Sequence, residues 1–152
     1  YEGISEYPMA ENTPVSFDEF FELYIGYAYP VIWNKLYRAS LVKDHPFAVV
    51  TYEDNAWTPV ILSYAEKICY INEHLYEYDR KIRSTTAIHT SISRPEEKQL
   101  EDRREYLMFF LTQGNPEKRN QLKRLALGYT LGYLDVFSHP GFKELRSEIE
   151  QM

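Results

Sequence analysis

Apolar residues recur at helical spacing through most of the chain, and the longest such run lies between residues 58 and 83. Its apolar positions are separated by four, four, three, four, three and four residues, which predicts a single stripe along an α-helix. Thr58 suits the N-cap of this helix, and Pro59 suits the first helical position, where no backbone N–H is needed. Such a helix is about 38 Å long, so other helices must lie along it. The stripe consists of Val60, Tyr64, Ile68, Ile71, Leu75, Tyr78 and Ile82.

An earlier helix is predicted to begin after Ser16, which forms a capping-box pattern with Glu19. Pro30 cannot donate a hydrogen bond to the carbonyl group of Gly26, so we expect a kink or a break at this proline. Helical spacing then resumes as far as Leu41. The first helix is therefore predicted to be kinked by proline.

A further helix is predicted after Ser93, which forms a capping-box pattern with Glu96 and puts Pro95 in the first turn. Two more are predicted from Pro116, with Asn115 as the N-cap, and after Pro140. Gly114 is expected to end the first of these three helices. The second is apolar nearly all round over residues 125–137, so we expect it to lie at the centre of the bundle or in an assembly. It also carries Gly128 and Gly132, a spacing that permits close approach of another helix.

These elements predict an all-α, up-and-down bundle of about five helices. Residues 1–15 show no sustained period and are interpreted as an extended N-terminal arm, either mobile or docked on a neighbouring molecule. Residues 16–152 form the helical bundle domain, and residues 47–52 are an extended connector within it. With 152 residues, the chain is long enough to bury a sizeable core.

Composition narrows the classes of protein only slightly. The 14 tyrosines, each with an apolar ring and a polar hydroxyl group, suit a bundle core whose edges contact water. They equally suit a protein contact surface. The single cysteine, Cys69, excludes a disulfide or CxxC site within one chain, and we expect it to be a small core residue of the long helix. No apolar run is long enough to span a membrane.

Charge is unevenly distributed along the chain, whose net charge is −6. Residues 1–30 contain six acidic and no basic residues, whereas residues 80–124 contain eleven basic and six acidic residues. If the helices pack antiparallel, basic residues of two helices meet and form a patch suited to phosphate contact. The alternative is a solvated surface of mixed charge. The candidate phosphate contacts are Arg80, Lys81, Arg83, Lys118, Arg119, Lys123 and Arg124.

Catalytic and metal-binding patterns are not evident, so we predict no catalytic residue, metal or cofactor. The four histidines lie on separate predicted elements, and no Glu-x-x-His step, phosphate-binding glycine loop or nucleophile motif occurs. Residues Arg83 to His89 resemble the R-x(4–6)-H motif of the HEPN family of all-α ribonucleases. This resemblance implies that the arginine and histidine act at a scissile phosphate.

The layout as a whole resembles the major capsid proteins of filamentous double-stranded DNA viruses of hyperthermophilic archaea. The matching features are an arm containing Pro8 and Pro14, the bend at Pro30, Tyr-rich helices and the apolar helix at 125–137. The resemblance implies helical-bundle subunits that assemble around the genome and contact it through basic residues on their helices. The acidic arm would then pair with the basic surface of a neighbouring subunit.

The leading hypothesis is a non-enzymatic coat subunit of a virion, which self-assembles or assembles with a related subunit into a filament around double-stranded DNA. Its phosphate contacts carry no sequence specificity. One alternative is an HEPN-like ribonuclease that uses Arg83 and His89. The other is a ligand-binding or interaction bundle located in the cytoplasm.

Overall fold

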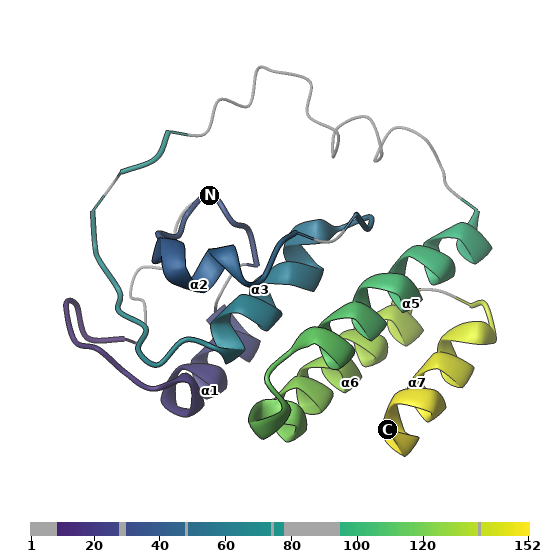
Figure 1. Ribbon diagram of the computed structural model, residues 1–152. Helices are drawn as coiled ribbons and strands as arrows, with labels where there is room; N and C mark the ends of the chain where they lie inside the picture. Colours follow the sequence, from purple (N-terminus) through teal and green to yellow (C-terminus); the bar gives the residue numbers. More distant parts are fainter. Residues whose placement is uncertain (1–8, 28–29, 48, 74, 78–94, 137) are drawn as a thin grey trace.

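The computed structural model describes residues 9–27, 30–47, 49–73, 75–77, 95–136 and 138–152. The prediction of an all-α helical bundle is confirmed, because these residues form six α-helices, one 3₁₀ helix and no strand. In Figure 1, α5, α6 and α7 lie together on one side of the molecule, and α1, α2 and α3 lie on the other. The helices are α1 (Phe17–Tyr27), α2 (Ala39–Lys43), α3 (Glu53–Ser63), α5 (Glu96–Gln113), the 3₁₀ helix η1 (Pro116–Lys118), α6 (Arg119–Val136) and α7 (Gly141–Gln151).

The start of α1 confirms the predicted capping box. The Ser16 backbone N–H donates to Glu19 Oε2 at 2.8 Å, and the Glu19 backbone N–H donates to Ser16 Oγ at 3.2 Å. These two bonds satisfy donors that the first helical turn leaves unpaired. The pKa of the Glu19 carboxyl group is lowered, because the Ser16 backbone N–H and the Ser16 hydroxyl both donate to Glu19 Oε2 and stabilise its ionised form.

The first helix does not continue past Pro30 as a kinked helix, since α1 stops at Tyr27 and no described residue between Pro30 and Arg38 is helical. The prediction of helix between residues 31 and 38 is therefore wrong. Lys35 illustrates why: its Nζ donates to the Val31 carbonyl oxygen at 2.8 Å, competing for the acceptor that a helical backbone N–H at position 35 would use. The Thr58 hydroxyl donates to the Pro30 carbonyl oxygen, which attaches this segment to α3.

Lys35 makes folding stability depend on pH. Burial lowers the pKa of its ammonium group to about 8, against the opposing charge of Asp54. Between pH 8 and 10.5 the unfolded chain retains a proton that the folded chain has lost. The free energy of unfolding therefore rises with pH in this window, by at most about 1.4 kcal/mol per pH unit.

We predict that Lys35→Met abolishes this rise, because the variant has no ammonium group to deprotonate. Urea unfolding at pH 7.5 and at pH 9.5 measures the effect, and Lys43→Met, at an exposed position, is the control that keeps it. The same rise in both variants would contradict the assignment to Lys35. Tyr37 acts in the opposite direction, because burial raises its pKa to about 12. Since Tyr37 is present in both variants, its contribution cancels in the comparison.

The long helix predicted over residues 58–83 does not form. Helix α3 begins five residues earlier than predicted and ends at Ser63, so Thr58 is a buried interior residue rather than an N-cap, and Pro59 lies inside the helix. Residues 64–73 and 75–77 contain no helix, and residues 78–83 lie outside the described residues.

Long-range hydrogen bonds account for the early end of α3. The Asn115 side-chain amide donates to the Ser63 carbonyl oxygen at 3.1 Å, and the Asn115 backbone N–H donates to Ser63 Oγ at 2.9 Å. Val15 and Ile68 then exchange two backbone hydrogen bonds, each of 2.9 Å. Because these partners hold residues near 68 in an extended conformation, Cys69 is exposed, and its prediction as a core residue is wrong.

Two predicted helix boundaries are confirmed at the junction of α5 and η1, whereas the capping box predicted at Ser93 lies outside the described residues, and Pro95 is the N-cap of α5. Gly114 is the C-cap residue of α5, and the Asn115 side chain caps η1 by accepting from the Glu117 backbone N–H at 3.0 Å. Helix α7 buries Phe142, Leu145 and Ile149 completely, as its amphipathic pattern predicts.

The core consists of two apolar clusters that share helices. One cluster joins α3, α5, α6 and α7, and the other joins Met9, α1, α3 and α6. Helix α3 contributes Val60 to the first and Trp57 to the second, while α6 contributes Ala126 and Leu125 in the same way. The bundle is thus organised around α3 and α6 rather than around the predicted long helix.

Candidate functional site

The predicted basic site is only partly described by the structure. Lys118 lies in η1, whereas Arg119, Lys123 and Arg124 lie in the first two turns of α6. Arg80, Lys81 and Arg83 lie outside the described residues, as does His89. The predicted meeting of two basic groups and the HEPN-like pair therefore remain predictions.

Two of the described cations pair with acidic residues of α1. Lys118 Nζ lies 2.8 Å from Asp18 Oδ2, and the Arg124 guanidinium binds both carboxylate oxygens of Glu22 at 2.7 and 3.2 Å. Gln121 adds a bond from its amide to Asp18 at 2.8 Å. The acidic N-terminal region thus neutralises part of the basic region within one chain.

These ion pairs position α1 more than they stabilise it. Both members of the Arg124–Glu22 pair are about three-fifths exposed, at 62% and 61% of their side-chain surface. Exposed pairs of this kind contribute about 0.2–1 kcal/mol each. Because Asp18 and Glu22 are four residues apart, their side chains share one face of α1 and set its alignment along α6.

Lys123 and Arg119, unlike Lys118 and Arg124, do not pair with acidic residues of α1. Lys123 Nζ donates to the Glu150 carbonyl oxygen at 2.6 Å, at the carboxyl end of α7, where cations are favoured. Arg119 is exposed and forms no ion pair with any residue that the structure describes. Neither charge is therefore balanced by a carboxylate of the described chain, and the two residues lie one turn apart on α6.

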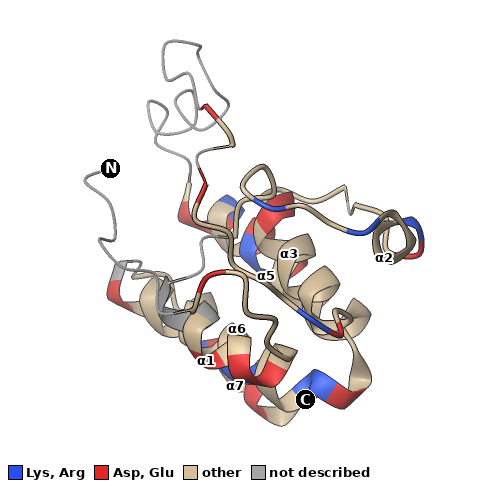
Figure 2. Ribbon diagram, turned by 90° about the vertical axis from the view of Figure 1, so that its left-hand side faces the viewer, with Lys and Arg blue, Asp and Glu red and all other residues tan. Residues whose placement is uncertain are grey.

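The other charged residues in the described part are interleaved rather than gathered. In Figure 2, both acidic and basic segments occur on α5 and on α7. Arg104 pairs with Glu148, and Arg103 lies between the rings of Tyr52 and Tyr133, 5.2 and 4.7 Å from their centroids. Both arginines thus join elements of the bundle to one another.

The described histidines have structural contacts. The His45 ring stacks on Tyr64 with a centroid distance of 4.1 Å, and His139 Nδ1 accepts from the Gly141 backbone N–H at 3.1 Å. Within the described residues, no three His, Cys, Asp or Glu side chains gather at a spacing that would hold a metal ion. None of the described helices is long and apolar enough to cross a membrane.

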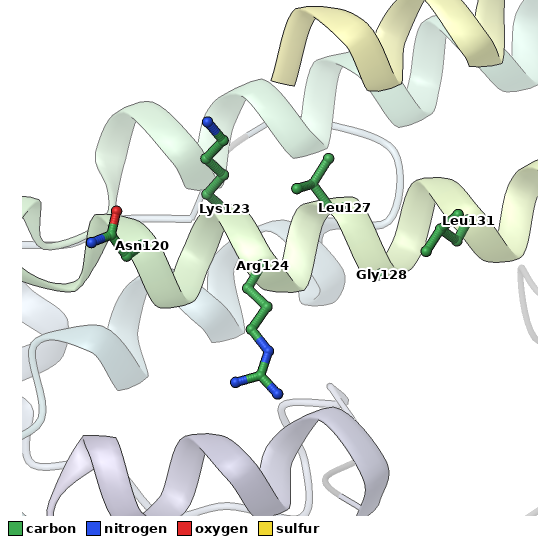
Figure 3. Close-up of a pocket in the computed structure, with 6 residues that line it drawn as sticks. All are labelled: Asn120, Lys123, Arg124, Leu127, Gly128 and Leu131. Atoms are coloured by element: carbon green, nitrogen blue, oxygen red, sulfur yellow. The ribbon is translucent and has the colours of Figure 1, made fainter. Parts of the chain in front are cut away.

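A shallow open groove runs along the outer face of α6 (Figure 3). Arg124 points from it towards α1, and Lys123 leaves α6 on the opposite side. The lining residues are Asn120, Lys123, Arg124, Leu127, Gly128 and Leu131.

Within one chain the apolar half of α6 is covered on only some of its sides, so of the two expected settings the centre of the bundle accounts for part of its surface. Leu131 is 47% exposed, and a Cβ atom added to Gly128 or Gly132 would meet no atom within 4 Å. The apolar pattern and the two glycines are visible in the sequence, but only the packing of α1, α5 and α7 reveals which face of α6 stays open.

Comparison of the chain with protein-family models, with curated proteins and with solved structures finds no match.

Proposed function

We propose that this chain is a non-enzymatic structural subunit that assembles with further copies of itself. The observation that carries this proposal is the amount of large apolar surface that the described residues leave exposed. Large apolar side chains that lie together at the surface mark protein contact sites, and the stacked Trp33 and Tyr76 rings are such a pair. The exposed large side chains are Trp33, Leu36, Phe47, Val49, Ile71, Leu75, Tyr76 and Leu131.

The exposed side chains include pre-ordered aromatic ones. Trp33 and Tyr76 stack with a centroid distance of 4.7 Å, yet they remain 43% and 53% exposed. A stacked pair loses little conformational entropy when a partner covers it, and Trp and Tyr are enriched at protein contacts. A filament coat, which the capsid resemblance implies, is one assembly that would use such surfaces.

We predict that the protein self-associates with increasing concentration. Sedimentation velocity from about 1 to about 500 µM spans the affinities that weak, transient contacts give. Negative-stain imaging of the same samples distinguishes filaments from closed oligomers. A chain that remains monomeric throughout this range would contradict the proposal.

Contact with double-stranded DNA is the second candidate function, favoured by Arg119 and Lys123, whose charges no described carboxylate balances. Lys118 and Arg124 are weaker candidates, because they would have to leave Asp18 and Glu22 to reach a phosphate group. Two phosphate contacts per subunit give a slope of log K against log salt of about −2, whereas the seven residues predicted from the sequence would give about −6.

We predict that the double variant Arg119→Glu, Lys123→Glu loses duplex binding at low salt, because each reversal replaces an attraction to phosphate by a repulsion. Fluorescence anisotropy with a labelled duplex across a salt series measures both the affinity and the slope. The matched control, Lys67→Glu with Lys143→Glu, changes net charge equally at exposed positions elsewhere. Equal binding by both double variants would rule out these two residues as phosphate contacts.

A further inference from the structure

We propose that the open face of α6 is the contact between two copies of this chain, which pack their α6 helices antiparallel about a two-fold axis. This inference rests on the proposed self-assembly and assigns it a surface. The face is a stripe with spacings of four, four, three and four residues along α6, and each of its members is exposed: Asn120, Arg124, Gly128, Leu131 and Asp135.

The stripe is complementary to itself when it is reversed. An antiparallel partner whose Leu131 lies opposite Gly128 also brings Leu127 opposite Gly132. A two-fold axis repeats each pairing in reverse, as an isologous contact requires. Each leucine of one helix thus faces a glycine of the other, and the space above both glycines is empty. This arrangement of large side chains against small ones permits close packing of two helices.

The same alignment pairs opposite charges. Arg124 lies opposite Asp135 of the second copy, at both ends of the contact. Asp135 is exposed and forms no ion pair within the described part of the chain. Arg124 binds Glu22 but keeps 62% of its side chain exposed, and a guanidinium group has five N–H donors, enough for a second carboxylate. Parallel packing would instead place like charges together.

The predicted contact is small. A single helix pair buries less than the roughly 1,200 Å² of a stable interface, so it belongs to the weak, concentration-dependent class. We expect dimers at concentrations on the order of 100 µM, and further contacts would be needed to extend them into a larger assembly.

Charge reversal tests the pairing directly. Asp135→Arg places two arginines opposite each other, and Arg124→Asp places two aspartates opposite each other. Each variant alone is expected to dimerise about ten-fold more weakly, because two symmetric exposed pairs become repulsive. An equimolar mixture restores both ion pairs and is expected to recover dimerisation at least to the level of the wild type. Glu105→Arg, an equal change of charge at an exposed position of α5, is the control and leaves dimerisation unchanged.

Sedimentation velocity at several concentrations measures the dimerisation of each variant, of the mixture and of the control. Circular dichroism verifies that every variant is folded. As a second test, Leu131→Lys removes the central apolar contact and is expected to abolish the dimer, whereas Thr112→Lys, at an exposed position of α5, retains it. Self-association that neither Leu131→Lys nor the charge reversals alter would overturn this contact while leaving self-assembly intact. A wild-type protein that is monomeric at every concentration would overturn both.

Discussion

Replacing Trp57 by alanine is expected to lower the free energy of unfolding by about 3–5 kcal/mol, the range for deletion of a large buried aromatic side chain. The Trp57 side chain is 1% exposed and holds the segment between α1 and α3 against the bundle. Its ring stacks on Phe47 with a centroid distance of 4.2 Å and meets the edge of Tyr37 at 5.1 Å. Its indole N–H donates to the His45 carbonyl oxygen at 2.6 Å.

Two further variants separate the contributions to this loss. Trp57→Phe keeps an aromatic ring but leaves the His45 carbonyl group without this donor, so we expect a smaller loss of about 1–3 kcal/mol. Trp33→Ala removes a tryptophan that is 43% exposed and should cost about 1 kcal/mol. Urea unfolding monitored by far-ultraviolet circular dichroism measures all three. Equal losses for Trp57→Ala and Trp33→Ala would contradict the assignment of Trp57 to the core.

Gly114→Ala is expected to destabilise the fold by about 1–3 kcal/mol, the cost of overfilling a packed site. Gly114 is buried at the turn between α5 and η1, with φ of −69°, a conformation open to any residue. The constraint is space: a Cβ atom would overlap the Leu122 side chain and lie 2.7 Å from the Phe110 carbonyl oxygen. Leu122 is itself 1% exposed and has little room to move.

Gly128→Ala is the matched comparison, and its effect should have the opposite sign. No atom lies within 4 Å of the added Cβ, and alanine favours a helix interior over glycine by about 1 kcal/mol. Thermal unfolding at low micromolar concentration, where dimers are negligible, compares the two variants. Destabilisation by both substitutions to a similar extent would contradict the packing described at Gly114 and the openness of the α6 face.

Predictions from neighbouring residues succeeded where the controlling interactions are local. Three features illustrate this: the Ser16–Glu19 capping box, the Asn115 cap and the amphipathic pattern of α7. In each, the interacting residues lie within one or two helical turns, so they can be identified from the sequence. The same applies to the break at Pro30, since a missing backbone N–H is a property of that residue alone.

The prediction failed at residues 58–83 because their helical spacing competes with distant partners. Ser63 is held by Asn115, 52 positions away, and Ile68 exchanges backbone bonds with Val15. Tertiary contacts of this kind override a periodic pattern, and the described apolar positions Ile68, Ile71 and Leu75 lie in a segment without helix instead of forming one stripe.

The sequence by itself therefore determined the helical class, several helix ends and the unequal distribution of charge, because these follow from composition and from contacts between near neighbours. Only the tertiary structure decided where those charges go and which apolar face stays uncovered. Asp18 meets Lys118 and Glu22 meets Arg124 across about a hundred residues, a match that depends on how α1 lies along α6. The open stripe of α6 likewise exists only because α1, α5 and α7 cover its other sides.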